Sequence, residues 1–389
     1  MDSKKILLIE PNPYHTDGLP GIVKYFSDLQ YMVDIYIQDK LLVDNGFFLY
    51  PRPINLYGYN FSEIRSLLSS TSVSEYDFVF FYSMEFTANG SICNILQHLG
   101  FMPASKYGIL GIYHTTTHID YFADHSIAKE GRLFCISDFQ INNYPINSLA
   151  PIFFGNNYTS ALDNKNTIIC IGGAFDEEML TDALRKISYK KKLGIPRVHL
   201  YGGRWQYGKK TIKRRIIAKV KLSIAWSIIY SKILYLLINM FISDKKIDRM
   251  MRFYYAETYI IKNGYVSFGR LFSELEKSKY ILVLINPHSE DHKHYMSITT
   301  SGIRQIILGF NKIPIIHTLV AEKYGFDENN SIIFDDTNLS EVLLSINNDE
   351  ENYKNKILAL RHLYERIYSS SLHNLKMAID NIIVKYSSV

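Results

Sequence analysis

The chain has 389 residues, more than one compact core usually holds, so its length predicts two domains. A formal net charge of +5, with charged residues at 21%, argues against a dedicated nucleic-acid-binding protein, which would carry a strongly basic face. Three widely spaced cysteines without a C-x-x-C pair argue against a disulfide framework and a zinc site, and they favour reduced thiols in the cytoplasm. The first apolar run is too short for a secretion signal, so we expect none.

The first half of the chain alternates predicted strands with predicted helices. Residues 22–29 have apolar positions at helical spacing, and a turn-rich loop at 10–21 precedes them. We expect short, buried strands at 4–9, 32–37, 77–82, 106–113 and 132–137. This alternation is typical of a mostly parallel sheet, in which ligands bind at the carboxyl ends of the strands. The loop glycines, Gly18 and Gly21, do not form G-x-G-x-x-G, so we expect no nicotinamide fingerprint.

The second half repeats this pattern, with glycines after several strands. We expect strands at 167–171, 197–201, 264–268, 280–285 and 312–316, and a last helix at about 352–388. The first three of these strands are followed by Gly172-Gly173, Gly202-Gly203 and Gly269. Two α/β layers in series predict a protein with two lobes and a ligand between them.

Residues 280–316 form one βαβ unit. A buried strand leads through a polar loop into a helix at 303–308, and a second strand follows. This helix begins after small hydroxyl residues and a glycine, namely Thr299, Thr300, Ser301 and Gly302. The unpaired amides and the partial positive charge of a helix N-terminus suit a phosphate. The unit therefore predicts a binding site for a diphosphate.

One segment interrupts the α/β pattern. Residues 209–221 contain seven Lys or Arg and no acid, and the mostly apolar run 222–242 follows. A membrane-spanning helix here would place the later strands on the wrong side of a bilayer, so we predict no such span. Two interpretations stay open, an interfacial helix on an anionic membrane surface and a helical hairpin packed on its own domain.

The order of these segments resembles the GT-B glycosyltransferases, two-lobed enzymes that transfer a sugar from a nucleotide-sugar donor, and especially bacterial cell-envelope members of the large retaining group. The resemblance covers most of the chain and is one of pattern. It includes the loop at 13–21, the histidine in Ile112-Tyr-His114, and Ser137-Asp138, where the family often has Ser-Glu. It also includes the strand–glycine segments at 171–173, 200–203 and 266–270, and a Gly-x-Pro-Val-Val-like strand at 312–316.

The resemblance implies an α/β fold with two Rossmann-like lobes facing each other across a cleft (GT-B), here with a basic helical insertion in the second lobe. The first, acceptor-side lobe is expected at 1–155. The second, nucleotide-sugar-binding lobe is expected at 165–370, with the insertion at about 208–258. A C-terminal helix at 371–389 could cross back to the first lobe.

The chain departs from the family at the donor site. Acids stand in Gly172-Gly-Ala-Phe-Asp-Glu-Glu178, where the family usually has an Arg and a Lys for the donor diphosphate. Glu290 could be the first member of the family's Glu-x7-Glu pair, but no Glu follows it on the helix after Thr300. Arg204, Arg270 and the amides of 299–302 are candidate replacements. The full set of expected nucleotide-sugar-binding residues is Gly18, Gly173, Gly203, Arg204, Gly269, Glu290, Thr299, Thr300, Ser301, Gly302 and Arg304.

Catalysis is assigned to His114, Asp17 and Arg270. Sugar transfer develops negative charge on the leaving phosphate, and arginines such as Arg270 and Arg304 are the residue types that stabilise it. The resemblance implies that His114 hydrogen-bonds the transferred sugar or supports the reacting centre. An inverting enzyme would need a base for the acceptor hydroxyl. Its candidates are Asp17, Glu85, His118 and Asp120, and the choice between retention and inversion stays open.

The polar loop at 288–294 contains three histidines and two acids, but its spacing matches no metal motif. The family generally does without a bound metal. We therefore expect no metal, and no cofactor beyond the nucleotide sugar as co-substrate. The loop either covers the donor or is an ordinary solvated loop.

These features predict a glycosyltransferase that passes a sugar to a glycan or lipid-linked acceptor in the synthesis of a bacterial surface polysaccharide, such as capsule, lipopolysaccharide or exopolysaccharide. We expect it in the cytoplasm, with residues 209–242 as a possible contact to the inner face of the membrane. Two alternatives remain, a catalytically inactive GT-B-like binding or scaffold protein and a nucleotide-sugar epimerase.

Overall fold

The structure is a computed structural model. It describes residues 4–12, 15–42, 50–88, 90–115, 117–136, 146–154, 165–172, 175–187, 197–202, 259–297, 302–346 and 349–388. The predicted insertion at about 208–258 and Ser137-Asp138 lie outside the described residues. So do six predicted donor-site residues, Gly173, Gly203, Arg204, Thr299, Thr300 and Ser301.

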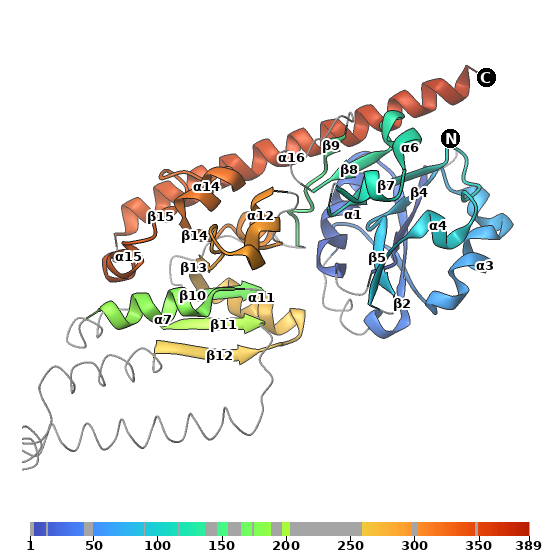
Figure 1. Cartoon of the computed structure of the whole chain (residues 1–389). Helices are drawn as coiled ribbons and strands as arrows, with labels where there is room; N and C mark the ends of the chain where they lie inside the picture. The colour runs from blue at the N-terminus through green and yellow to red at the C-terminus, as the bar shows by residue number, and fades with distance from the viewer. Residues whose placement is uncertain are drawn as a thin grey trace, which may run out of the picture.

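The N-terminal lobe is built on a parallel sheet in the order β3-β2-β1-β4-β7-β8-β9 (Figure 1). Its strands are β1 (Lys5–Glu10), β2 (Met32–Gln38), β3 (Asn55–Tyr59), β4 (Phe78–Phe81), β7 (Ile109–Tyr113), β8 (Leu133–Cys135) and β9 (Asn147–Ser148). The predicted parallel sheet is confirmed, and the five expected strands are found within a few residues of their predicted bounds. β3 and β9 are additional, because an edge strand such as β3 is only partly buried and lacks a continuous apolar run.

Short helices and one hairpin surround this sheet. The longest helix, α1 (Leu19–Asp28), starts with a proline in its first turn and buries Ile22, Val23 and Phe26 against the sheet. The hairpin of β5 (Glu85–Ala88) and β6 (Ser91–Asn94) follows β4. The remaining elements are short α-helices and 3-10 helices, the latter labelled η. They are η1 (Thr16–Gly18), η2 (Asp39–Leu41), η3 (Phe61–Glu63), α3 (Ile64–Ser69), η4 (Thr71–Glu75), α4 (Ile95–Leu99), α5 (Thr117–Tyr121) and α6 (His125–Lys129).

The C-terminal lobe has a second parallel sheet in the order β12-β11-β10-β13-β14-β15. Its strands are β10 (Lys165–Gly172), β11 (Val198–Gly202), β12 (Ile260–Gly264), β13 (Ser278–Val283), β14 (Ile313–His317) and β15 (Ile332–Phe334). The order reverses between β10 and β13, the topological switch point at which open α/β sheets bind ligands. In Figure 1, the arrowheads of β11 and β12 point toward the side on which the N-terminal lobe lies.

The predicted strand at 264–268 is wrong. The strand lies earlier, at β12, because Ile260 and Ile261 pair with β11, and Gly264 ends the strand at a φ of +70°. Residues from Phe268 onward form α11 (Phe268–Lys277), whose Leu271, Phe272 and Leu275 recur at helical spacing in the core. Gly269 is therefore the second residue of a helix rather than the end of a strand.

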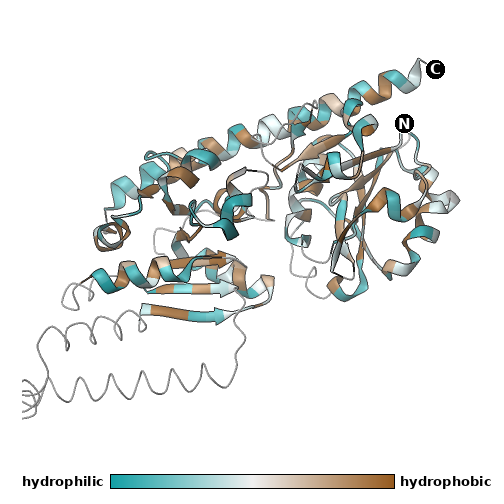
Figure 2. Ribbon diagram, viewed as in Figure 1, coloured by the Kyte–Doolittle hydropathy of each residue, from teal (hydrophilic) through white to brown (hydrophobic). Residues whose placement is uncertain are grey.

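The βαβ unit predicted over 280–316 is confirmed as β13, α13 (Ile303–Phe310) and β14. The loop between β13 and α13 also forms η6 (Glu290–His292) and α12 (Lys293–Ser297). The other helices of this lobe are α7 (Glu177–Lys186), α14 (Thr318–Tyr324) and α15 (Leu339–Ser345). In Figure 2 the strands of the N-terminal lobe are largely brown, which reflects the buried apolar runs from which the sequence predicts them.

The last helix, α16 (Glu350–Ser387), packs on both lobes (Figure 1). Its 38 residues extend over about 57 Å. Leu360 and Leu363 belong to the core of the C-terminal lobe, whereas Leu375 and Ile379 belong to that of the N-terminal lobe. None of the helices among the described residues combines the length and the apolar character needed to cross a membrane.

The segment that joins the lobes is held from three sides. The Tyr25 hydroxyl donates to the Ala150 carbonyl at 2.6 Å, and the Ala150 amide donates to Ser371 Oγ of α16 at 3.1 Å. Phe154 then packs against Phe310, with ring centroids 5.4 Å apart, inside the C-terminal core. These contacts fix where the chain leaves the first sheet and enters the second.

Candidate functional site

Polar side chains gather where three neighbouring strands of the N-terminal sheet end. We call Glu10, His15, Asp17, Ser83, Glu85, His114 and His118 the N-terminal cluster. Glu10 ends β1, Ser83 follows β4 and His114 follows β7, so the parallel sheet brings distant residues to one edge. Four members of the cluster are predicted from the sequence, whereas Glu10, His15 and Ser83 are not. The position of Glu10 and Ser83 directly at strand ends is the signal that could have found them.

His114 is buried and held by its Nε2 atom. That nitrogen lies 3.1 Å from the Tyr82 carbonyl oxygen and 3.2 Å from Ser83 Oγ. Because a carbonyl can only accept, Nε2 carries the hydrogen. Ser83 Oγ in turn donates to Glu10 Oε2 at 2.9 Å, so a short chain of hydrogen bonds runs from His114 to Glu10.

Burial lowers the pKa of His114 well below its usual value, and the neighbouring His15 contributes in the same direction. The rings of His15 and His114 are stacked, with centroids 4.1 Å apart. Burial also lowers the pKa of His15, to about 4. Both imidazoles are therefore neutral near pH 7, and the stacked pair avoids the repulsion of two imidazolium ions.

The carboxyl groups of the cluster are shifted in the opposite direction. Burial raises the pKa of Glu10 well above its usual value, and that of Glu85 as well. Burial likewise raises the pKa of Asp17, to about 6, against the opposing effect of backbone hydrogen bonds. Asp17 thus titrates close to neutral pH, which is the property of a side chain that exchanges protons in a reaction.

Glu85 positions the chain at the end of β7. Its Oε1 atom accepts hydrogen bonds from the amides of His114, at 2.7 Å, and Thr115, at 3.2 Å. His118 Nδ1 lies 3.7 Å from the same oxygen, which is too long for a hydrogen bond. Among the described residues, Glu85 Oε2 has no hydrogen-bond partner. Gly18 packs closely here, because a Cβ atom at that position would collide with the Tyr82 hydroxyl.

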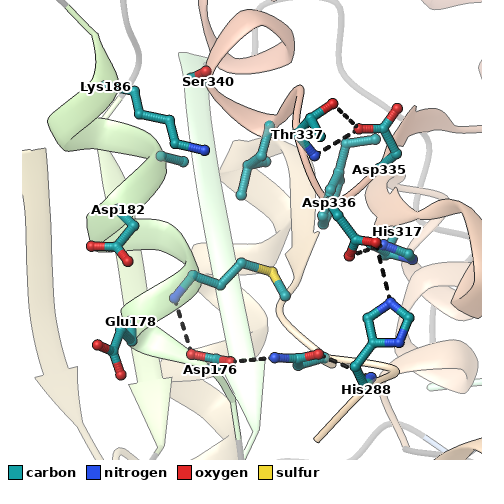
Figure 3. A pocket seen from close by; sticks show the side chains of 15 residues that line it. Asp176, Glu178, Asp182, Lys186, His288, His317, Asp335, Asp336, Thr337 and Ser340 are labelled. Atoms are coloured by element: carbon teal, nitrogen blue, oxygen red, sulfur yellow. Dashed lines mark hydrogen bonds and ion pairs between the residues drawn. The ribbon is translucent and has the colours of Figure 1, made fainter.

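A cavity of about 420 Å³ lies in the C-terminal lobe, beside the ends of β13, β14 and β15 (Figure 3). We call it the C-terminal pocket. Helix α7 forms one wall, and the residues after β15 form the opposite wall. Its lining residues are Asp176, Glu178, Met179, Asp182, Ala183, Lys186, Asn286, His288, His317, Phe334, Asp335, Asp336, Thr337, Leu339 and Ser340.

The pocket begins at the topological switch point of the sheet. Asp176 caps α7 by accepting the Met179 amide at 3.0 Å, and its second oxygen accepts from Asn286 Nδ2 at 2.9 Å. The Asn286 amide donates to His292 Nδ1 at 2.9 Å. These bonds tie the loop after β10 to the loop after β13.

The lining of the pocket is rich in acids. Five of the lining residues carry a carboxyl group, and Lys186 is the one lysine or arginine among them. The five acids are Asp176, Glu178, Asp182, Asp335 and Asp336. A diphosphate placed there alone would meet like charges. The sequence expectation of a diphosphate-binding site therefore calls for positive charge from another source.

Three pocket residues form a compact group. One oxygen of Asp336 forms a hydrogen bond with His317 Nε2 at 3.1 Å, and the other forms one with His288 Nε2 at 3.2 Å (Figure 3). The ligand atoms of the three side chains all lie within 4.8 Å of one another. Within the described part of the chain, this is the group of His, Cys, Asp or Glu residues whose geometry could hold a metal ion.

The predicted donor residues that the structure describes do not line this pocket. Arg304 is buried in α13, and its Nε donates to the Tyr324 carbonyl at 2.9 Å. Glu290 is exposed, and its Oε2 atom lies 3.5 Å from Lys293 Nζ. Gly302 precedes α13, with open space where a side chain would begin. Their donor contacts stay predictions.

Arg270 is exposed on the first turn of α11. Burial raises the pKa of Tyr201 at the end of β11, and Arg270 acts on that pKa in the opposite direction. The guanidinium therefore lies near the carboxyl end of the sheet. The structure places His114 and Asp17 together in the N-terminal cluster and keeps Arg270 on the other lobe.

No family model and no curated protein matches the chain. Solved structures, in contrast, do match the chain. A glycosyltransferase from Rickettsia africae is 13% identical, with a TM-score of 0.55 over 98% of this chain and 99% of that one. Anabaena HepE in complex with UDP and glucose is 11% identical, with a TM-score of 0.50 over 99% of this chain and 100% of that one. The chain thus has a GT-B glycosyltransferase-like fold, as the sequence resemblance predicts.

Proposed function

We propose that the protein is a glycosyltransferase that moves a sugar from a nucleotide-sugar donor to a hydroxyl of a glycan or lipid-linked acceptor. One observation carries this proposal. On a GT-B fold, the strand ends of the N-terminal lobe bear two neutral histidines and a carboxyl group whose pKa is raised to about 6. The solved structure of HepE, a protein of this fold, contains UDP and glucose.

The proposed reaction uses the two lobes differently. The acceptor hydroxyl lies against the N-terminal cluster, where Asp17 is mostly ionised at pH 7 and can accept its proton. The donor lies at the carboxyl ends of the C-terminal strands, near the switch point. There Arg270 stabilises the charge that develops on the leaving diphosphate, together with the amides that the sequence predicts at 299–302.

We further propose that the acceptor belongs to the synthesis of a bacterial surface polysaccharide at the inner face of the membrane. The support comes from the sequence, because the basic segment 209–221 and the apolar run 222–242 together suit an anionic membrane surface. Deleting 209–242 should then release the protein from anionic vesicles in a flotation assay. Unchanged partitioning would instead favour a hairpin packed on its own domain.

The proposal is tested with a panel of UDP-, GDP-, CMP- and dTDP-sugars. The expected result is a rise in melting temperature with one class of nucleotide, together with slow hydrolysis of the matching sugar donor. If no nucleotide raises the melting temperature, the donor site does not exist. Stabilisation without any hydrolysis or transfer would favour an inactive, sugar-nucleotide-binding scaffold.

A further inference from the structure

His288, His317 and Asp336 meet in the C-terminal pocket from three separate segments of the chain. His288 belongs to the loop after β13, His317 ends β14, and Asp336 follows β15. Asp336 is 48 residues from His288 and 19 residues from His317 along the chain. The meeting therefore depends on the parallel order of β13, β14 and β15, whose carboxyl ends lie at one edge.

The distances match those of a tetrahedral metal site. Zinc binds imidazole nitrogen and carboxylate oxygen at about 2.0–2.1 Å, so two ligands of one tetrahedral ion lie about 3.3–3.4 Å apart. His317 Nε2 lies 3.1 Å from one oxygen of Asp336, and His288 Nε2 lies 3.2 Å from the other, so both oxygens of this carboxylate face the position of the ion. No ligand atom is more than 4.8 Å from another, and closing the remaining gap requires the exposed His288 side chain to rotate.

The surroundings favour a cation. His317 is buried and its ring is held edge-on against Phe334, so it forms a fixed anchor. His288 and Asp336 have side chains that are 58% and 62% exposed, which leaves them open to the pocket. The other carboxylates of the pocket add negative potential, and a site with three protein ligands keeps one coordination position for a water or a ligand.

A bound ion has to displace the hydrogen bonds that the three side chains make in the structure. His317 Nδ1 accepts the Leu319 amide at 3.2 Å and so caps α14, which means that Nε2 carries the hydrogen and donates it to Asp336. An ion on Nε2 replaces that hydrogen, and the neutral ring then carries its proton on Nδ1. Metal binding therefore exchanges the capping contact and the two hydrogen bonds to Asp336 for three coordinate bonds, and it leaves the Leu319 amide without its acceptor.

We propose that His288, His317 and Asp336 form a binding site for a divalent transition-metal ion, with zinc as the best fit among ligand types. The ion adds two positive charges to an acid-lined pocket at the switch point. If the proposed function holds, this charge offsets the pocket carboxylates and gives the donor diphosphate a partner.

The first experiment measures metal binding without any substrate. The full chain, free of any histidine tag and treated with EDTA, is titrated with Zn²⁺ by calorimetry at pH 7.5. One zinc per chain is expected. His288→Ala and Asp336→Asn should each weaken binding at least tenfold. Both side chains are exposed, so the variants should keep the fold, and melting curves in EDTA check this. Wild-type affinity in both variants, or no binding by the wild type, would overturn the site.

The matched control is His362→Ala. His362 is an exposed histidine with an acidic neighbour, Glu365, at 3.6 Å, but it lies on α16 outside the pocket. This variant should bind zinc as the wild type does, and an equal loss would show adventitious surface binding instead. Hydrogen exchange gives an independent readout, because zinc should speed exchange at the Leu319 amide in the wild type and not in His288→Ala.

The link to the donor is tested separately by titrating UDP with and without Zn²⁺. Zinc should tighten UDP binding at least tenfold in the wild type and leave His288→Ala unchanged. If zinc binds but UDP affinity does not respond, the metal site stands and its link to the donor is refuted. If zinc binds and no nucleotide binds under either condition, the proposed function fails while the metal site remains.

Discussion

At the scale of single residues, the N-terminal cluster combines opposite pKa shifts in a small volume. Burial lowers the pKa values of His15 and His114 and raises those of Glu10, Asp17 and Glu85. Desolvation is the first cause in every case, because it disfavours whichever form is charged. Pairs of titratable groups driven apart in this way are typical of sites that move protons.

The raised pKa of Asp17 predicts a pH dependence. If Asp17 is the base, only its ionised form works, so activity should be full above pH 7 and fall as the pH drops through about 6. Between pH 7 and pH 5 the ionised fraction falls about tenfold. A pH profile of donor turnover checks this, and Asp17→Asn should remove the acidic limb.

Asp120→Asn is the matched control for that profile. Asp120 is an exposed aspartate on α5 that lies beside His125 of α6, and it was also a candidate base from the sequence. Its substitution should leave the acidic limb in place. A limb that survives in Asp17→Asn and disappears in Asp120→Asn would assign the base to Asp120.

His114→Ala should reduce turnover at least tenfold while the fold survives, because it removes the first donor of the hydrogen-bond chain from His114 through Ser83 to Glu10 and the ring that stacks on His15. Steady-state kinetics and a melting curve provide the measurement. His98→Ala is the control, since His98 also stacks on an aromatic ring, that of Phe61, but lies on α4 outside the cluster. Wild-type turnover in His114→Ala would refute the assignment.

At the scale of elements, the joining segment and α13 approach each other more closely than a side chain allows. A Cβ atom on Gly309 would lie 2.6 Å from the Ile152 carbonyl oxygen and would collide with the Phe154 ring. A carbonyl of the main chain cannot move aside cheaply. The glycine is therefore a packing requirement of the contact between α13 and the segment that joins the lobes.

Gly309→Ala should lower the free energy of unfolding by about 1–3 kcal/mol, as overpacking of a dense core does. Denaturant titration with circular dichroism measures the loss. Gly302→Ala, at a helical position with open space around it, should change stability little and serves as the control. Equal stability in the two variants would mean that the contact relaxes without cost.

At the scale of the whole molecule, α16 joins the two cores. Leu375 is fully buried in the core of the N-terminal lobe, although its helix begins in the C-terminal lobe. Leu375→Ala should destabilise the protein by about 2–5 kcal/mol, because it leaves a cavity in that core. Met377→Ala, an exposed position on the same helix, should have little effect. Similar melting temperatures for both variants would show that α16 does not support the N-terminal core.

Much of this architecture was predictable from local pattern. Apolar runs such as 4–9 and 280–285 are short and bounded by turn residues, so strand formation there follows from burial and sequence together. The apolar pattern did not predict β3, because most of its residues alternate between exposed and half-buried at a sheet edge. It also placed β12 too late, because the glycine at 269 resembles the glycines that do end strands.

The candidate site was less predictable for a physical reason. Local sequence pattern alone predicts two α/β lobes, a histidine at position 114 directly after a strand, and Asp17 in the loop after the first strand. Three features follow from the three-dimensional arrangement alone: His15 stacks on His114, Arg304 is buried in a helix, and His288 meets Asp336. Strands form from neighbouring residues, whereas a site forms from residues far apart in the chain, which only the order of the strands brings together.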